Sequence, residues 1–285
     1  MELFRRFCAL SSRRRAPSSL LVVAHPDDEI IGAGARISHV GKCHVVHVTD
    51  GAPRNLRDSV RGGYSSREAY AQARFEEARE ALALARTRPV EIRRIGITDQ
   101  ESAWHLVEIV RFLVTLLREI RPDLLLTHSY EGGHPDHDSV SFASRAACEI
   151  VRRRKEQRAP VIIEMAGYHA WCGEMRTGKF LPVPGDREES AGVETRAIRL
   201  SAAESRLKKE MLACHRSQRA MLDHFSTEWE SFRLSPKYDF REPPHDGSLF
   251  YEWFDWGIKS GQWRQLAALA HEALVREKLV HERGP

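Results

Sequence analysis

The chain has 285 residues, of which 42% are hydrophobic and 29% are charged, and its formal net charge is +4 at pH 7. These values are typical of a soluble globular protein with one or two domains, and they exclude a collagen-like or largely disordered chain. The small positive charge does not indicate a nucleic-acid-binding protein, because the basic residues of such proteins cluster on one face. We therefore expect no nucleic-acid partner.

The cysteines and apolar runs indicate the cellular setting. Five cysteines are widely spaced and form no CxxC pair, so neither a disulfide framework nor a cysteine-based zinc site is expected, and a cytoplasmic location is the simplest. The apolar runs are far shorter than the roughly 20 residues that span a bilayer, which argues against stable membrane insertion. Residues 1–18 are basic and lack the apolar stretch of a signal peptide, so we expect a flexible basic arm there.

Strand-like and helix-like segments alternate over the first 166 residues. Five short apolar runs have the length and composition of strands: 20–24, 43–49, 91–97, 123–127 and 161–166. Helical patterns lie between them at residues 29–40, 66–86, 103–120 and 138–157. This alternation predicts an α/β fold with a Rossmann-like, doubly wound and mostly parallel sheet. Ligands of such sheets bind beyond the carboxyl ends of the strands.

The rest of the chain has a different pattern. Residues 172–190 and 235–248 are rich in glycine and proline and are expected to be loops. Ser201 and Glu204 have the spacing of a capping box, which predicts a helix running to about residue 215, and a last helix is expected from about residue 261. We divide the chain into the arm 1–18, a main domain 19–225 and a C-terminal aromatic-rich extension 226–285 packed on that domain.

Aromatic side chains are concentrated in residues 229–263. One interpretation is that these rings pack the extension onto the domain. The other is that one or two of them, with Trp253 and Trp256 as candidates, line a ligand site or its opening.

Ionisable side chains follow two of the predicted strands. The first strand runs into His25, Asp27 and Asp28, and the fourth is followed by His134 and His137. Both loops open at the same edge of a parallel sheet, so these side chains can converge. Two histidines and one aspartate are a common ligand set for catalytic zinc, with a fourth position open to water, whereas a single such loop is equally compatible with a capped turn.

These motifs resemble a known family. Ala24–Glu29 (AHPDDE) with His134–His137 (HPDH) is similar to the PIG-L/LmbE family of zinc-dependent N-acetylglucosaminyl deacetylases. The resemblance extends over about residues 18–220. It continues through Val48–Gly51 (VTDG), Arg74 and Glu77, Asp99, Arg121–Asp123 (RPD) and Ser217–Gln218.

The resemblance implies a metal centre. His25, Asp28 and His137 match the metal ligands of the family, and Asp27 matches its general base. The implied cofactor is Zn²⁺, and Fe²⁺ is compatible with the same ligands. His128 either supports these ligands or has a purely structural role.

Further residues match the substrate side of the family site. His134 matches the histidine that stabilises or protonates the tetrahedral intermediate, and Asp136 matches the carboxylate that orients and tunes its imidazole. Arg74 and Asp99 match positions around the substrate. The segment Ala52–Asn55 departs from the best-known members, some of which carry an acidic residue there.

The resemblance implies a hydrolase that removes the N-acetyl group from an N-acetylglucosamine-type moiety of a small glycoconjugate or natural-product intermediate, releasing acetate and a free amine. Two alternatives remain open. One is an amidase on a non-sugar or thiol-conjugated amide, and the other is a non-catalytic carbohydrate- or nucleotide-binding α/β module. Gly32 and Gly34 give only a broken dinucleotide fingerprint inside a predicted helix, and we expect these glycines to let the helix pack closely on the sheet.

Overall fold

A central sheet of seven strands organises the chain. A computed structural model describes residues 1–9, 16–85, 90–154, 157–182 and 193–277, and within them the strand order is β3–β2–β1–β4–β5–β9–β8. The first five strands are mutually parallel, whereas β9 is antiparallel to both β5 and β8. The prediction of a mostly parallel, doubly wound α/β sheet is therefore confirmed.

The strands of this sheet are β1 (Ser19–Val23), β2 (Cys43–Pro53), β3 (Glu91–Asp99), β4 (Leu124–His128), β5 (Val161–Met165), β8 (Thr195–Arg199) and β9 (Trp229–Leu234), and β6 (Tyr168–Trp171) pairs with β7 (Glu174–Thr177) in a separate hairpin. The helices are α1 (Glu2–Cys8), α2 (Asp28–Ile37), α3 (Arg57–Arg61), α4 (Arg67–Ala83), α5 (Leu106–Ile120), α6 (Pro135–Arg154), α7 (Ala202–Cys214), α8 (Arg219–Leu222) and α9 (Ser260–Arg276). Short 3₁₀ segments lie at residues 102–105, 216–218 and 250–253.

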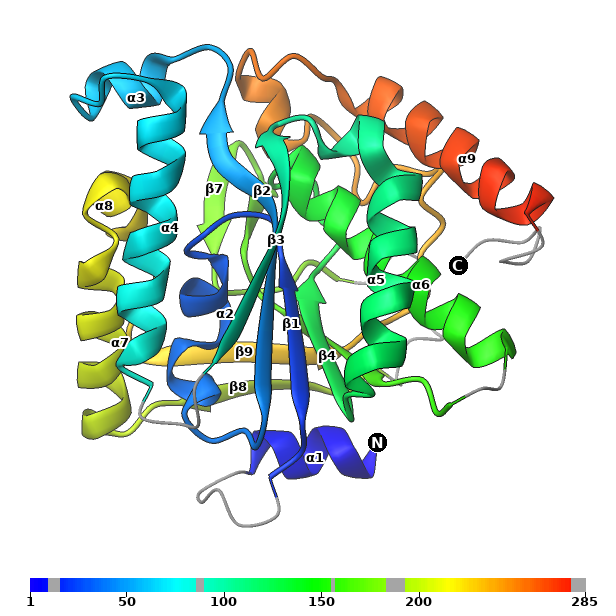
Figure 1. Cartoon of the computed structure of the whole chain (residues 1–285), viewed down its shortest axis with the longest axis horizontal. Coiled ribbons are helices and arrows are strands. Elements are labelled where there is room, and N and C mark those ends of the chain that lie inside the picture. Colours follow the sequence, from blue (N-terminus) through cyan, green and yellow to red (C-terminus); the bar gives the residue numbers. More distant parts are fainter. Residues whose placement is uncertain (10–15, 86–89, 155–156, 183–192, 278–285) are drawn as a thin grey trace.

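Helices cover both faces of the sheet. Figure 1 shows α2, α4 and α7 on one face and α5, α6 and α9 on the other. The expected apolar stripe of α5 is buried, with Ile109, Leu113 and Leu117 fully enclosed, and the helix ends directly before Arg121-Pro122, as a proline requires. The strands thus lie between two apolar layers, as parallel sheets do.

Close packing explains a glycine in α2. A Cβ atom on Gly32 would lie 2.8 Å from the Cβ atom of Met165 in β5, closer than two carbon atoms can approach without a clash. Gly32 therefore lets the helix approach the sheet, as the sequence indicates. No helix in the described part of the chain is long and apolar enough to cross a membrane.

Parts of the expected loops and arm have regular structure. Within the arm 1–18, α1 forms a helix whose Phe4 and Phe7 are fully buried. The Phe7 ring lies 5.0 Å from that of Phe232 in β9, edge to face. The expectation of a flexible arm is thus wrong for α1, because its two phenylalanines bury an apolar face that is too short to show periodicity. Residues 10–15 are outside the described ranges.

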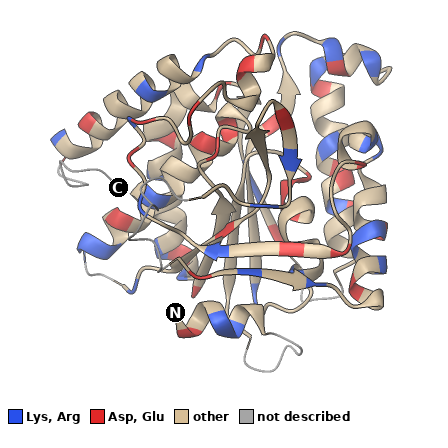
Figure 2. Ribbon diagram, turned by 180° about the vertical axis from the view of Figure 1, so that it is seen from behind, with Lys and Arg blue, Asp and Glu red and all other residues tan. Residues whose placement is uncertain are grey.

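The region after residue 166 differs from expectation in two places. The hairpin β6–β7 overlaps the predicted loop 172–190, of which residues 183–190 lie outside the described residues, and β8 was not predicted. The capping box of Ser201 and Glu204 is present at the start of α7, as predicted. The boundary expected at residue 225 falls just before β9, which belongs to the central sheet. Figure 2 shows acidic and basic residues interspersed along the outer helices.

Candidate active site

The residues expected to form a site converge at the carboxyl edge of the parallel strands. His25 and Asp28 follow β1, Asp99 ends β3, and His137 lies in the first turn of α6 after β4. The chain order of the sheet reverses between β1 and β4, and doubly wound sheets bind ligands at such a switch point. All four side chains line a cavity of about 1080 Å³.

Three of these residues form a compact donor set. The ligand atoms of His25, Asp28 and His137 lie within 4.8 Å of one another, and all three residues are buried. Asp28 is central to this set: its Oδ2 is 3.2 Å from His25 Nδ1 and its Oδ1 is 3.3 Å from His137 Nε2. His137 Nε2 makes no hydrogen bond within the described residues. A buried nitrogen without a partner, facing a carboxylate and a second imidazole, suits a cation in the space between them.

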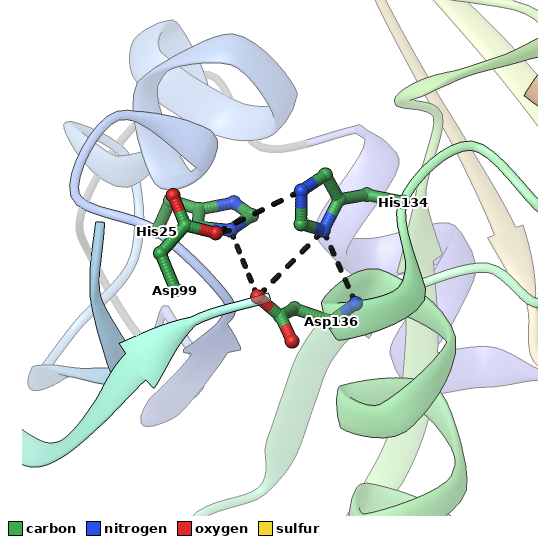
Figure 3. A group of neighbouring side chains, drawn as sticks. All are labelled: His25, Asp99, His134 and Asp136. Carbon is green, nitrogen blue, oxygen red and sulfur yellow. Dashed lines mark hydrogen bonds and ion pairs between the residues drawn. The ribbon is translucent and has the colours of Figure 1, made fainter. Parts of the chain in front are cut away.

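His25 also contacts a second group of side chains, shown in Figure 3. Its Nε2 lies 3.0 Å from Asp99 Oδ1 and 3.3 Å from Asp136 Oδ2. His134 faces the same two carboxylates, with Nε2 3.8 Å from Asp99 and Nδ1 3.7 Å from Asp136. These four residues form a further possible metal-binding group. Each nitrogen of His25 therefore faces a different acidic neighbour.

The charge of the cluster is unbalanced. Asp27, Asp28, Asp99 and Asp136 are each at most 7% exposed. Arg74, 6% exposed, pairs with Asp27 and Asp99, whereas Asp28 and Asp136 face histidine imidazoles. Buried charges are costly unless they are paired or bind a metal. A divalent cation bound among these buried carboxylates and imidazoles would neutralise the excess negative charge. The residues present fit a metal ion of the zinc or iron class.

Asp27 is held apart from the donor sets. Arg74 Nη2 donates a hydrogen bond to Asp27 Oδ2 at 2.8 Å, and the Asp27 backbone N–H donates to Glu29 Oε2 at 3.2 Å. Asp27 has a φ of 151°, a backbone conformation that costs about 1–3 kcal/mol outside glycine and persists where surrounding contacts enforce it. The strained turn thus presents a carboxylate to the cavity that is not part of the donor set.

Burial and neighbouring charges set the protonation of the cluster. Burial raises the pKa of Asp27 to about 7, although Arg74 opposes the shift. Burial also acts on Asp28, but there the His137 and His128 imidazoles outweigh it and hold the pKa well below its usual range. Adjacent aspartates therefore differ in proton affinity, a pattern that separates a proton-transferring carboxylate from a permanently charged one.

His134 and Asp136 contact each other mainly through the backbone. The Asp136 N–H donates to His134 Nδ1 at 3.1 Å. The Asp136 carboxylate is instead held by Gln100 N at 2.6 Å and by the Ser102 hydroxyl at 2.5 Å. Burial, followed by the charge of His25, lowers the pKa of His134 well below its usual value. The lowered pKa favours the neutral form of the His134 imidazole, and the Asp136 N–H bonded to Nδ1 favours the tautomer with the hydrogen on Nε2.

Three aromatic side chains support the imidazoles. The His128 ring stacks on His137 with centroids 3.9 Å apart, and its Nε2 accepts the Ala24 N–H at 3.0 Å. His128 therefore lies directly against His137, one of the predicted metal ligands. Tyr168 in β6 lies 5.2 Å from His137, and Trp256 lies 4.6 Å from His134, ring to ring. No motif predicts Tyr168, whereas the concentration of aromatic residues in the extension indicates Trp256.

The aromatic residues of the extension divide into two kinds. Most of them pack against the domain, and the most enclosed are Phe232, Tyr251 and Trp263, all fully buried. Trp256 instead lines the cavity, while Trp253 is 41% exposed and is not among the residues that line it. Both interpretations of the aromatic segment therefore apply, to different rings.

Arg74 and Asp99 both line the cavity. Arg74 Nη1 lies 4.0 Å from Asp99 Oδ2, and it donates to the Gly51 carbonyl at 2.5 Å. Within the divergent segment, Arg54 and Asn55 do not line this cavity but a smaller neighbouring one. The contacts of this loop are thus directed away from the donor set.

With this geometry established, the chain can be compared with known proteins. Residues 20–148 match the model of the PIG-L family, described as GlcNAc-PI de-N-acetylase. Within these residues the chain is similar to the PIG-L family. The matched segment contains both motifs on which the resemblance rests, and the resemblance is confirmed.

Characterised relatives share this segment. A 1D-myo-inositol 2-acetamido-2-deoxy-alpha-D-glucopyranoside deacetylase of Salinispora arenicola is 31% identical over 154 residues, which are 46% of this chain and 50% of that protein. A protein of the same name from Mycobacterium tuberculosis is 31% identical over 144 residues, covering 42% of this chain and 47% of its own. The chain thus spans about half the length of the curated relatives it matches.

Solved structures share the fold. A deacetylase in the biosynthesis pathway of teicoplanin superposes with a TM-score of 0.58 at 17% identity, covering 78% of this chain and 99% of that chain. An N,N'-diacetylchitobiose deacetylase from Pyrococcus horikoshii gives a TM-score of 0.51 at 17% identity, covering 82% and 92%. At this identity the likeness shows the fold alone.

Proposed function

We propose that this protein is a metal-dependent de-N-acetylase that hydrolyses the acetamide of an N-acetylglucosamine-type group on a small glycoconjugate. One observation carries the proposal: Asp27 is a buried carboxylate with a raised pKa, held beside the donor set His25, Asp28 and His137 without belonging to it. A metal-binding set next to a separate proton-transferring carboxylate is the arrangement that amide hydrolysis requires.

The metal ligands in this proposal are His25, Asp28 and His137, and the ion is Zn²⁺, with Fe²⁺ compatible. A bound zinc ion lowers the pKa of a coordinated water towards about 7 and polarises a carbonyl oxygen. Asp28 remains ionised because its pKa is lowered by the adjacent imidazoles. His128, stacked on His137, keeps that ring in place.

Asp27 is the general base. It accepts a proton from the attacking water, and it delivers that proton to the amine nitrogen as the C–N bond of the tetrahedral intermediate breaks. The products are acetate and a free amino sugar. Arg74 holds the Asp27 carboxylate through its 2.8 Å hydrogen bond, and the raised pKa lets Asp27 both accept and return a proton near neutral pH.

His134 stabilises the oxyanion as a hydrogen-bond donor. The resemblance implies a histidine that stabilises or protonates the intermediate, and the lowered pKa favours stabilisation by a neutral ring. Because Nδ1 accepts the Asp136 N–H, the ring hydrogen lies on Nε2, which points into the cavity. We propose that Asp136 acts on this ring mainly through its backbone, and that Arg74 and Asp99 contact the sugar.

Residues 19–225 supply the proposed ligands, base and oxyanion donor. The extension 226–285 contributes Trp256 to the cavity and β9 to the sheet. We therefore propose that the extension completes the enzyme rather than forming a separate unit.

An acetate-release screen tests this function. The protein, supplied with Zn²⁺ or Fe²⁺, is incubated with N-acetylglucosaminyl conjugates of inositol, malate, nucleotides and lipids, and with N-acetylated thiol conjugates as non-sugar amides. We expect acetate from at least one N-acetylglucosaminide. Acetate from the non-sugar amides alone would favour the amidase, and substrate binding without acetate release would favour a non-catalytic binding module.

A further inference from the structure

One residue of the first motif has no role in the site described above. Glu29 ends the sequence AHPDDE and is fully buried, but it belongs to neither donor set and does not line the cavity. His47 in β2 is also fully buried, and its Nε2 lies 3.1 Å from Glu29 Oε2. An ionised carboxylate only accepts hydrogen bonds, so His47 is the donor. We call these two residues the Glu29–His47 pair.

The pair reaches the backbone of Asp27. Glu29 Oε2, the oxygen bonded to His47, also accepts the Asp27 N–H at 3.2 Å. On the other side of the same residue, the Asp27 carbonyl accepts the N–H groups of Ile30 and Ile31 at 2.9 and 3.0 Å. Asp27 has a φ of 151°, which a residue other than glycine keeps only where its surroundings enforce it. The Glu29 carboxylate is therefore one of the restraints that hold this strained residue.

The strand β2 fixes His47 relative to the loop that carries Asp27. His47 is in register with Val23, the last residue of β1. Two residues further along β2, the backbone N–H and the hydroxyl of Thr49 both donate to the Ala24 carbonyl at 2.9 Å. The start of the loop and the partner of the Glu29 carboxylate are thus held by the same strand.

We propose that the Glu29–His47 pair positions the general base. His47 holds the Glu29 carboxylate, Glu29 holds the Asp27 peptide, and the strained turn directs the Asp27 carboxylate to the attacking water. Neither residue of the pair lines the cavity, so both are positioning residues. The inference rests on the proposed function, in which Asp27 is the base. A displacement of about 1 Å in a reacting group can cost about 10²-fold in rate, so losing the pair should slow the reaction.

A folded variant without the pair separates positioning from folding. Glu29→Met combined with His47→Leu removes the acceptor and the donor together, so no charge is left unpaired in the interior and the fold is retained. We expect kcat for acetate release, per metal-loaded chain, to fall about 10- to 100-fold. KM should change little, because neither residue contacts the substrate. Steady-state kinetics, metal analysis and a thermal melt are measured on the same sample, and an unchanged kcat would overturn the inference.

The conservative variant Glu29→Gln separates the hydrogen bond from the charge. The amide oxygen of glutamine can accept both hydrogen bonds that Glu29 Oε2 makes. Its NH₂ group then takes the place of Oε1, which has no hydrogen-bond partner among the described residues. We expect Glu29→Gln to recover most of the kcat lost in the double variant. A loss as large as that of the double variant would show that the charge acts instead, and would overturn the inference.

A second buried pair on the same helix gives a matched control. Glu230 accepts the N–H groups of Ala35 and Arg36 in α2 at 2.8 and 3.2 Å, and it lies 3.1 Å from Lys208 Nζ. These contacts are about two helical turns from Asp27. Lys208→Met combined with Glu230→Gln is expected to lower stability and keep the wild-type kcat. An equal fall of kcat in both double variants would overturn the inference, because any loosening of α2 would then slow the reaction.

Amide hydrogen exchange tests the contact without the reaction. Exchange of the Asp27 N–H is followed by NMR in the wild type, in Glu29→Gln and in the double variant of Glu29 and His47. We expect exchange at least about tenfold faster in the double variant than in the other two. Faster exchange in a protein that releases no acetate would support the positioning of Asp27 and contradict only the proposed function. An unchanged exchange rate in the double variant would overturn the inference.

Discussion

Two buried polar clusters of this protein are built in opposite ways. One is the candidate active site, and the other surrounds Glu164 in β5, which is 0% exposed. The carboxylate of Glu164 accepts hydrogen bonds from Arg145 Nη2 and Arg233 Nε, both at 2.7 Å, from Ser235 Oγ at 2.8 Å and from the Tyr238 hydroxyl at 2.9 Å. Each oxygen of Glu164 thus has two protein donors.

The balance of charge differs between the two clusters. We call the side chains around Glu164 the Glu164 network. In it, Glu131 adds a second carboxylate, and Arg145 and Arg233 supply two guanidinium groups. In the candidate active site, Arg74 pairs with two of the four aspartates, Asp27 and Asp99, and the other two face imidazoles. A buried cluster whose charges are matched by its own residues holds a fold together, whereas an excess of buried carboxylates requires a ligand. The comparison therefore separates a structural cluster from a functional one.

The largest expected effect concerns the reaction. Asp27→Asn keeps the size of the side chain and removes its ability to accept a proton. We expect kcat for acetate release to fall about 10²–10⁴-fold, with little change in metal content, because Asp27 lies outside the donor set. The measurement is acetate release with metal analysis of the same sample. Turnover at the wild-type rate would show that Asp27 is not the base.

Substitutions in the Glu164 network should change the stability of the protein rather than its activity. Arg233→Met leaves Glu164 and Glu131 partly unpaired in the interior and is expected to lower the free energy of unfolding by about 3–5 kcal/mol. Urea denaturation measures this loss. In Arg241→Met, by contrast, an exposed arginine bonded to Asp239 is removed, and we expect a change of at most about 1 kcal/mol. Similar losses of unfolding free energy in Arg233→Met and Arg241→Met would contradict the claim that the buried arginine stabilises the fold more than the exposed one.

The smallest expected effect is a pH dependence near the site. His215 is 1% exposed, and neither ring nitrogen has a hydrogen-bond partner among the described residues. Burial lowers its pKa from 6.5 to about 4. Between these values the unfolded chain binds a proton that the folded chain does not, so stability falls as the pH drops through this window. We expect His215→Gln to lessen the loss of stability between about pH 7 and about pH 5 by about 2 kcal/mol.

Urea titrations at the two pH values measure this difference. A His215→Gln variant whose stability declines with pH as steeply as that of the wild type would show that His215 is charged in the folded state. His105→Gln is a matched control, because His105 is an exposed histidine beside Glu108.

The sequence predicted the parts of the site that lie next to regular strands. His25, Asp28 and His137 follow from two motifs at strand ends, since a parallel sheet brings those ends together. Trp256 lies in an irregular segment, and no periodicity indicates that it reaches the His134 ring. Likewise β9 pairs with β5 across 67 residues or more of sequence, a long-range contact that local patterns do not encode. The helix α1 was missed because two buried phenylalanines are too few for a periodic signal.

Metal binding tests the central claim most directly. The purified protein is dialysed against chelator, reloaded with Zn²⁺ or Fe²⁺, and analysed for bound metal and for acetate release, with His137→Ala and the surface variant His105→Gln treated in the same way. We predict about one tightly bound ion per chain in the wild type and the control, and a loss of both metal and activity in His137→Ala. A wild-type protein that binds no divalent ion, or a His137→Ala variant with unchanged metal content and activity, would contradict the account.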